Sequence, residues 1–328
     1  MRRRAGLAAA GLLLLAGLAR AQTGTPASPT APQSLAPPAA PAELQAPEAS
    51  TRPDVDFAYA AYQRGLYLTA FREATRRIEA DPNDSAAMTL IGELYANGFG
   101  VRQDWSKAAD WYRLASQRGD PQASYALAMQ MLDGRGVPKD SAGGRRLLAT
   151  AADKVPAAAY AMGLLLLEDN KPESDRRAAS LMRFAADASE SEAQYAMALL
   201  YRQGRGVEKD PSEMLLWMAR AAANRSAAAQ VDYGIMLFNG DVVPKNEEAA
   251  ARYFQRAAER GNAVAQNRLA RLYASGRGVS KNLIEAGKWH LLANERGVAD
   301  GFLDQILRDM KPEDRARSEE AARKWRGD

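Results

Sequence analysis

The stretch GRGVPKD at residues 134–140 recurs along the chain at nearly regular intervals. GFGVRQD begins at Gly98, GRGVEKD at Gly204 and GRGVSKN at Gly276, and a blurred copy, GDVVPKN, begins at Gly240. The first glycines are spaced by 36, 70, 36 and 36 residues, so the double step predicts one degenerate copy between the second and the third. A fixed period of this length is typical of a solenoid, in which each repeat is one supersecondary unit stacked on the next.

Each repeat predicts two antiparallel helices joined by this loop. In residues 85–119, apolar and small residues recur at the three- and four-residue spacing of a helix face. Gly98 and Gly100 end that helix, because glycine enters the left-handed conformation without steric cost. Asp104 then caps the second helix through its side-chain oxygen. The other copies hold an Asp or Asn at the same place: Asp140, Asp210, Asn246 and Asn282. Glu213 and Glu285 each stand three residues after a cap and predict capping boxes.

The degenerate copy is expected at residues 157–187. Its loop, EDNKPESD, has lost both glycines and the valine, and Asp175 stands 35 residues after the cap Asp140. We therefore predict a hairpin with a reshaped, more mobile turn, in which Asp175 aligns with the cap position. The repeats then number six, beginning near residues 85, 121, 157, 191, 227 and 263.

The order of residues in the repeat resembles the Sel-one-like repeat (SLR) family of the tetratricopeptide-repeat superfamily. The first repeat carries the pattern at Ile91, Gly92, Tyr95, Gly98, Gly100, Val101, Asp104, Lys107, Ala108, Trp111, Tyr112, Ala115 and Gly119. The resemblance implies an all-α fold, a right-handed α-α superhelical solenoid of antiparallel helix hairpins over residues 85–298. Residues 54–84 resemble a tetratricopeptide-like hairpin. Residues 299–328 depart from the repeat and predict capping helices, with Pro312 beginning the last helix and Trp325 packing back on the stack.

The N-terminal residues predict export. Residues 1–21 combine three arginines, an apolar run and a small-x-small ending, which is the pattern of a cleaved secretory signal peptide. Residues 22–53, rich in Ala, Pro, Ser and Thr, predict a disordered linker. Removing residues 1–21 takes away four arginines and leaves 40 basic and 40 acidic residues. We therefore expect a periplasmic protein without a stable membrane span, and no electrostatic case for nucleic-acid binding.

Few residues of the chain suit catalysis. It has no cysteine and one histidine, His290, which occupies an aromatic packing position of the repeat. Without a second histidine or a thiolate, neither a zinc site nor a Ser-His-Asp triad can be assembled, and no cofactor is expected. The alternative is an envelope enzyme or a β-lactam-binding protein, as implied by cysteine-rich relatives of the family, whose cysteines this chain lacks.

A binding role is expected on the first helix of each hairpin, which lines the concave wall of such a superhelix. Counting from the Leu-Gly position of each repeat places three residues of each first helix on that wall. At the two ends of the array they are Thr89, Glu93, Ala96 and Asn267, Arg271, Ala274, which make the ends polar, whereas the middle is aromatic and apolar. Ten residues of the middle repeats are the candidates for partner binding. They are Tyr125, Met129, Leu132, Tyr160, Leu164, Tyr195, Leu199, Arg202, Ile235 and Phe238. Two interpretations remain open. The tyrosines either pack between adjacent first helices or belong to an apolar stripe that binds an extended peptide or an amphipathic helix.

The sequence as a whole favours a non-enzymatic adaptor. Together with the predicted export, the resemblance leads us to expect a monomeric periplasmic protein that binds another protein or peptide of the cell envelope. The identity of that partner is not encoded in any motif of the chain.

Overall fold

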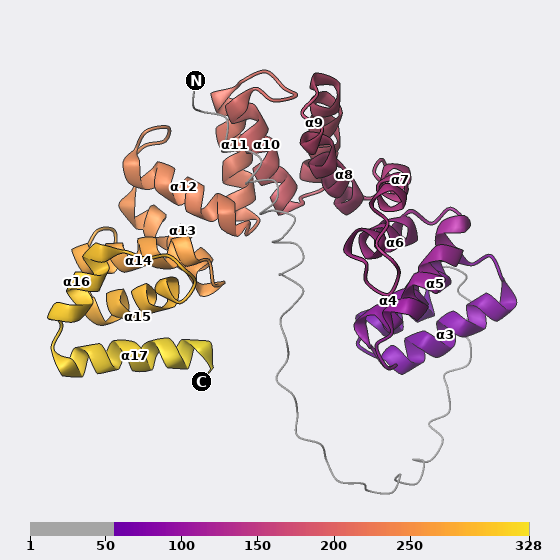
Figure 1. Ribbon diagram of the computed structural model, residues 1–328, viewed down its shortest axis with the longest axis horizontal. Coiled ribbons are helices and arrows are strands. Elements are labelled where there is room, and N and C mark those ends of the chain that lie inside the picture. Colours follow the sequence, from indigo (N-terminus) through magenta and orange to yellow (C-terminus); the bar gives the residue numbers. More distant parts are fainter. Residues whose placement is uncertain (1–55, 328) are drawn as a thin grey trace, which may run out of the picture. The chain divides into compact units, whose positions relative to one another are not determined.

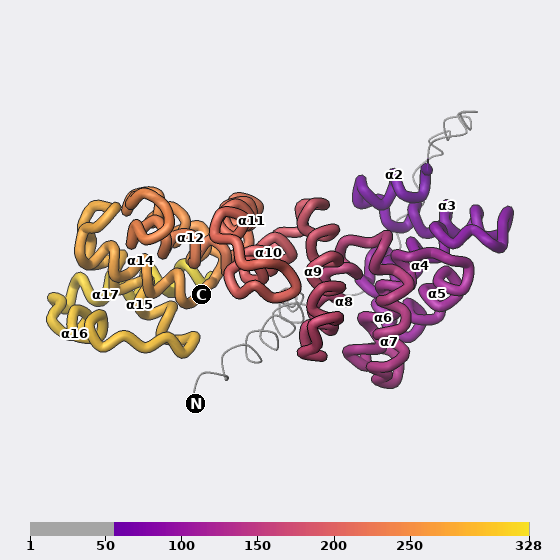
Figure 2. The backbone as a smooth tube through the Cα atoms, turned by 90° about the horizontal axis from the view of Figure 1, so that it is seen from above, coloured from indigo at the N-terminus to yellow at the C-terminus, as the bar shows by residue number. Residues whose placement is uncertain are grey.

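The computed structural model describes residues 56–327, and this part of the chain consists of helices and loops without a strand (Figure 1). The predicted signal peptide and linker lie outside the described residues. The chain divides after Ala151 into two compact units. Within each unit, consecutive helices pack as hairpins and each hairpin packs on the next (Figure 2). The all-α solenoid expected from the repeat is confirmed.

The first unit contains α2 (Phe57–Gln63), α3 (Tyr67–Ala80), α4 (Ser85–Asn97), α5 (Trp105–Gln117), α6 (Pro121–Asp133) and α7 (Ser141–Ala151). The second contains α8 (Pro156–Glu168), α9 (Pro172–Asp187), α10 (Ser191–Gln203), α11 (Pro211–Ala223), α12 (Ala227–Asn239), α13 (Glu247–Glu259), α14 (Ala263–Ser275), α15 (Leu283–Asn294), α16 (Gly301–Asp309) and α17 (Pro312–Arg326). The pairs from α4/α5 to α14/α15 are the six repeats. Within these residues no helix is both long and apolar enough to cross a bilayer.

The first glycine of each loop ends the first helix of its hairpin, as expected. Gly98, Gly134, Gly204, Gly240 and Gly276 all have left-handed φ angles, between 69° and 82°. The Asp or Asn that follows each loop accepts a hydrogen bond from a backbone N–H in the first turn of the second helix. The tight turn and its cap therefore join the two helices of every repeat except α8/α9.

The second loop glycine serves a contact between neighbouring hairpins that the sequence did not predict. A Cβ built on Gly136 would lie 2.4 Å from the carbonyl carbon and oxygen of Trp105, the first residue of α5 in the preceding hairpin. The same approach, with 2.2 Å to a carbonyl oxygen, recurs for Gly206 on Asp175 and for Gly278 on Glu247. No side chain fits such a gap, so glycine alone allows the loop to rest on the neighbouring helix.

The arginine between the two glycines reaches the same neighbour. Arg205 donates a hydrogen bond to the carboxylate of Asp175 at 2.7 Å, and both side chains are largely shielded from solvent. Equivalent contacts join Arg277 to Glu247 and place Arg135 over the ring of Trp105. The repeated Gly-Arg-Gly thus makes two contacts with the preceding hairpin. The second glycine packs closely on its backbone, which we call the loop seat, and the arginine contacts one of its side chains.

The third hairpin differs from expectation at its turn. α9 begins at Pro172, and its N-cap, Lys171, makes no side-chain cap bond, so Asp175 is not a cap. Because the loop without glycines is shorter, the helix begins earlier and Asp175 lies in its first turn. There its carboxylate accepts the hydrogen bond from Arg205 instead.

The predicted capping boxes at Glu213 and Glu285 are also wrong. Their carboxylates accept hydrogen bonds from the indole N–H groups of Trp217 and Trp289, each at 3.0 Å, one helical turn later. The backbone N–H of each cap residue donates to a carbonyl of the preceding helix in the same hairpin. The glutamates therefore orient the buried tryptophans of α11 and α15.

The C-terminal helices cover the last hairpin. α17 begins at Pro312, and its Trp325 packs edge-on against Trp289 of α15, with ring centroids 6.1 Å apart. His290 is buried, and its Nε2 lies 2.7 Å from Asp304 of α16. His290 therefore contributes to packing, as its place in the repeat indicates.

The loop seat predicts unequal effects of two glycine substitutions. Gly136 and Gly119 both have positive φ, but a Cβ on Gly119 would meet no atom within 4 Å. At the place of Gly119, other repeats already hold non-glycine residues with positive φ, Ser189 and Arg225. Backbone strain of about 1–2 kcal/mol is common to both changes. We expect Gly136→Ala to lower the free energy of unfolding by about 1–3 kcal/mol more than Gly119→Ala, because only Gly136 is overpacked. Urea unfolding followed by circular dichroism measures this difference, and equal losses would contradict the loop seat.

A double-mutant cycle tests the arginine contact. Changing Arg205 and Asp175 to Ala, singly and together, should give a coupling energy above about 1 kcal/mol, because the two side chains are in contact and shielded. The control is Arg183 with Asp187, an exposed pair one helical turn apart, for which we expect less than about 0.5 kcal/mol. A coupling between Arg205 and Asp175 as small as that of the control pair would show that the contact does not join the hairpins.

Candidate binding face on the first helices

The ten residues predicted for partner binding lie on the first helices of four hairpins. α6 carries Tyr125, Met129 and Leu132; α8 carries Tyr160 and Leu164; α10 carries Tyr195, Leu199 and Arg202; α12 carries Ile235 and Phe238. Arg202 is exposed, seven others are half-buried, and two are buried. The set is therefore not a uniform stripe, and its members have different surroundings.

Tyr160 and Leu164 are interior residues, which corrects their predicted role. Only 6% of Tyr160 and 5% of Leu164 is exposed. Alanines and a glycine occupy the neighbouring buried positions of α8, and such small residues let helices approach closely enough to enclose the larger side chains. Burial also raises the pKa of the Tyr160 hydroxyl, since it disfavours the phenolate. For these two residues the packing interpretation holds.

On α6, Leu132 points toward its own hairpin. Its Cγ would lie 2.9 Å from a Cβ built on Gly144 of α7, so this leucine packs on the glycine backbone of the second helix. Tyr125 and Met129 remain half-buried.

A polar group joins α10 to α12. The hydroxyl of Tyr195 donates a hydrogen bond to Asp232 at 3.0 Å, and the guanidinium of Arg202 lies 3.9 Å from the same carboxylate. Burial and the nearby carboxylate raise the pKa of Tyr195, so this hydroxyl remains a donor. Asp232 is therefore satisfied by the preceding hairpin.

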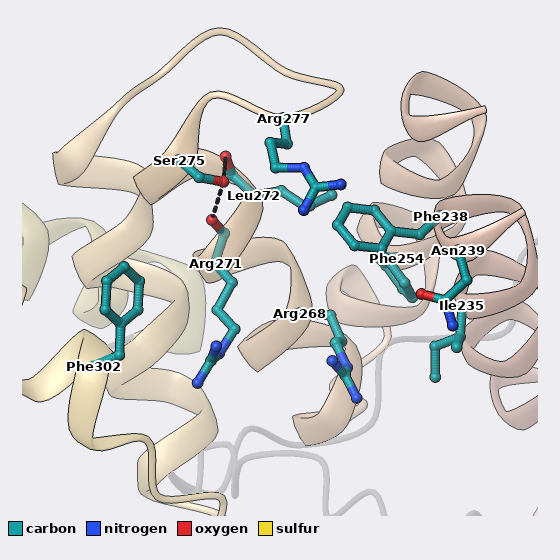
Figure 3. Close-up of a pocket in the computed structure, with 10 residues that line it drawn as sticks. All are labelled: Ile235, Phe238, Asn239, Phe254, Arg268, Arg271, Leu272, Ser275, Arg277 and Phe302. Carbon is teal, nitrogen blue, oxygen red and sulfur yellow. Dashed lines mark hydrogen bonds between the residues drawn. The ribbon is translucent and has the colours of Figure 1, made fainter. Parts of the chain in front are cut away.

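Ile235 and Phe238 line a pocket of about 310 Å³ between α12, α14 and α16 (Figure 3). The lining residues are Ile235, Phe238, Asn239, Phe254, Arg268, Arg271, Leu272, Ser275, Arg277 and Phe302. Phe254 and Leu272 are buried, whereas Phe302 is 51% exposed. The pocket combines an apolar wall with three arginines, and all its elements belong to the second unit.

Two of these arginines are held by carboxylates. Asp300 accepts hydrogen bonds from Arg271 at 2.5 and 2.8 Å. Although burial alone would raise it, these bonds hold the pKa of Asp300 below its usual range. Glu247 accepts from Arg277, and hydrogen bonds from Arg277 and Lys245 lower the pKa of Glu247 to about 2. Both carboxylates are therefore ionised at neutral pH.

The arginines also lie against the aromatic rings of the wall. The guanidinium of Arg277 is 4.0 Å from the ring centroid of Phe238, and that of Arg271 is 5.4 Å from the centroid of Phe302. Figure 3 shows Arg268 and Arg271 projecting from α14 toward the same side. These cation–π contacts help to fix the two rings at the pocket's edges.

Counting from the repeat glycine missed most of this pocket. Arg268 lies one position beyond the counted Asn267, and Phe302 lies outside the repeats altogether. Arg277 was visible as the arginine of GRGVSKN, but its contact with Phe238 was not. Only Ile235, Phe238 and Arg271 stand at counted positions.

The described residues offer few groups for catalysis. Within residues 56–327 no group of three or more His, Cys, Asp and Glu side chains could hold a metal ion. His290 is only 1% exposed, so a substrate cannot reach it without unpacking the C-terminal helices. The pocket is lined mainly by apolar side chains and arginines, which are groups suited to binding a ligand.

Comparisons with known proteins agree with the repeat. The family model of the Sel1 repeat matches six segments: residues 85–120, 121–154, 156–190, 191–226, 227–262 and 263–298. The crystal structure of a Sel1 repeat protein from Oxalobacter formigenes is similar, with a TM-score of 0.64 and 28% identity, covering 73% of this chain and 98% of that chain. The structure of c5321, a protective antigen of uropathogenic Escherichia coli with an SLR fold, gives a TM-score of 0.50 at 23% identity, covering 79% of this chain and 64% of that chain.

No curated protein matches the chain. The similarity to c5321 concerns the fold alone. The six matched segments span most of the described residues, and their starts agree with the predicted ones to within one residue. The chain belongs to the Sel1 repeat family.

Proposed function

We propose that this chain is a non-enzymatic adaptor that is exported to the periplasm and, as a monomer, binds a protein or peptide of the cell envelope. Its six Sel1 repeats form a helical repeat module of the kind that mediates protein–protein interaction. Binding takes place on the face of the first helices.

The observation that carries this proposal is the pocket between α12, α14 and α16. Its apolar wall is incompletely covered in the folded chain, since Ile235 and Phe238 are half-buried and Phe302 is half exposed. Concave sites with an apolar lining and a few convergent polar groups are where proteins bind ligands. Uncovered apolar surface rimmed by charged groups also marks interaction sites.

The remaining predicted residues extend this face along the second unit. Leu199 of α10 is half-buried, and Arg202 is exposed while its guanidinium faces the carboxylate of Asp232. Tyr160 and Leu164 are excluded from the face because they are buried. The proposed face of the second unit therefore consists of α10, α12 and α14.

Export has its own test. The protein expressed from its full sequence should fractionate with the periplasm and begin near Gln22, as measured by N-terminal sequencing. Placing arginines at Leu13 and Leu14 should leave the precursor intact, because charged residues interrupt the apolar run of the signal peptide. A chain that still begins at Met1 in the wild type would contradict export.

Site-specific crosslinking in intact cells tests partner binding. A photoreactive benzoylphenylalanine at Asn239, which is exposed and lines the pocket, should give a discrete crosslinked species identifiable by mass spectrometry. The control is the same group at Leu216 of α11, a second-helix residue that is 42% exposed. If Leu216 captures the same species as Asn239, or Asn239 captures none, the face of the first helices is not the binding surface.

A further inference from the structure

The pocket between α12, α14 and α16 has an unbalanced charge. Its ten lining residues include three arginines and no carboxylate. Asp300 neutralises Arg271 and Glu247 neutralises Arg277 from outside the lining. In the described part of the chain, Arg268 makes no hydrogen bond or ion pair. One guanidinium at the pocket is thus left for an external anion.

The apolar half of the pocket is shaped for a side chain. Ile235 and Phe238 form one wall on α12, and Phe302 of α16 stands across from them (Figure 3). Buried Phe254 and Leu272 close the interior. A volume of about 310 Å³ lies at the small end of protein ligand sites, so it suits one or two side chains and not a folded domain.

We propose that this pocket binds an extended acidic segment of the partner protein, inserting one large apolar side chain between Phe238 and Phe302 while an adjacent Asp or Glu pairs with Arg268. This assignment rests on the proposed adaptor function and names the chemistry of its ligand. Charge complementarity selects this occupant, because a basic segment would be repelled by Arg268. A nucleic acid has phosphates for the arginine but no aliphatic side chain for the apolar wall.

The planar guanidinium of Arg268 can donate two parallel hydrogen bonds to one carboxylate. Arg268 is exposed, so its guanidinium is accessible to a carboxylate of the partner segment. Arg271 and Arg277 cannot substitute for Arg268, since their carboxylate partners already occupy them. Loss of Arg268 should therefore remove the preference for an acidic residue and leave the apolar preference in place.

An unbiased peptide selection tests whether Arg268 and the apolar wall recognise different residues of the ligand. The chain from residue 22 onward is used as bait for a phage-displayed library of random 12-residue peptides. The wild type should enrich peptides with a large apolar residue next to Asp or Glu. Arg268→Glu should abolish the acidic preference, and Phe238→Ala should abolish the apolar one.

The affinity of an enriched peptide is then measured by fluorescence anisotropy. Arg268→Glu should weaken it by about tenfold or more, the range of a charge-assisted hydrogen bond. The matched control is Arg72→Glu on α3, an exposed arginine that likewise makes no hydrogen bond or ion pair within residues 56–327. Its charge change is identical, but Arg72 does not line the pocket, so the affinity of this variant should stay within about twofold of the wild type.

Several outcomes would overturn the assignment. One is a selected motif without an acidic residue, and another is a motif that Arg268→Glu leaves unchanged. A concentration-dependent increase in mass that Arg268→Glu abolishes would instead assign the pocket to a second copy of the chain. The affinity for peptides could be unchanged by Arg268→Glu and Phe238→Ala while the photoreactive group at position 239 still crosslinks to an envelope protein. In that case the proposed ligand chemistry is wrong but the adaptor function stands. If both experiments find nothing, both proposals fail.

Discussion

One backbone contact recurs at three junctions of the stack: the second glycine of a loop packs on the first turn of the preceding hairpin's second helix. Gly136 lies on Trp105, and the same geometry recurs at Gly206 and Gly278. A single hairpin cannot bury its apolar face, so a solenoid gains its stability from contacts between nearest neighbours. The third hairpin has lost its own glycine loop but still presents Asp175 to Gly206 and Arg205 of the next. A degenerate repeat thus remains tied to the hairpin that follows it.

Much of this fold follows from the period of the sequence, because the same local signals recur in each copy. Glycine ends the first helix and Asp or Asn caps the second in five of the six hairpins. The period of the sequence does not show which group each side chain contacts. Glu213 fits a capping pattern, yet its carboxylate accepts a hydrogen bond from the indole N–H of Trp217 and not from the backbone of the cap residue. A local motif considers one helix end, whereas the hydrogen bond that a carboxylate makes depends on every donor near it, including side chains further along the helix.

The candidate site could be predicted only in part for a related reason. Counting from the repeat glycine selects one row of each first helix and finds Ile235 and Phe238. It treats all copies alike, so it also selects Tyr160 and Leu164, which small neighbours on α8 allow to be enclosed. It cannot find Phe302, which belongs to no repeat. The pocket exists because the array ends there, and a capping helix stands where another hairpin would otherwise pack.

The charges of this face show how one position of the repeat can serve two purposes. Arg268 occupies the place in its hairpin that Asp232 occupies in the hairpin before it. Asp232 is held by Tyr195 and Arg202 of the preceding first helix, so its charge is used within the stack. For Arg268 the preceding helix offers Ile235 and Phe238 in place of an anion, while Asp300 of the cap is taken by Arg271. Residues shared by all copies build the stack, and departures from the pattern leave groups without an internal partner. A binding site in such a protein is therefore to be sought where the repeat is broken, as it is at the junction of α14 and α16.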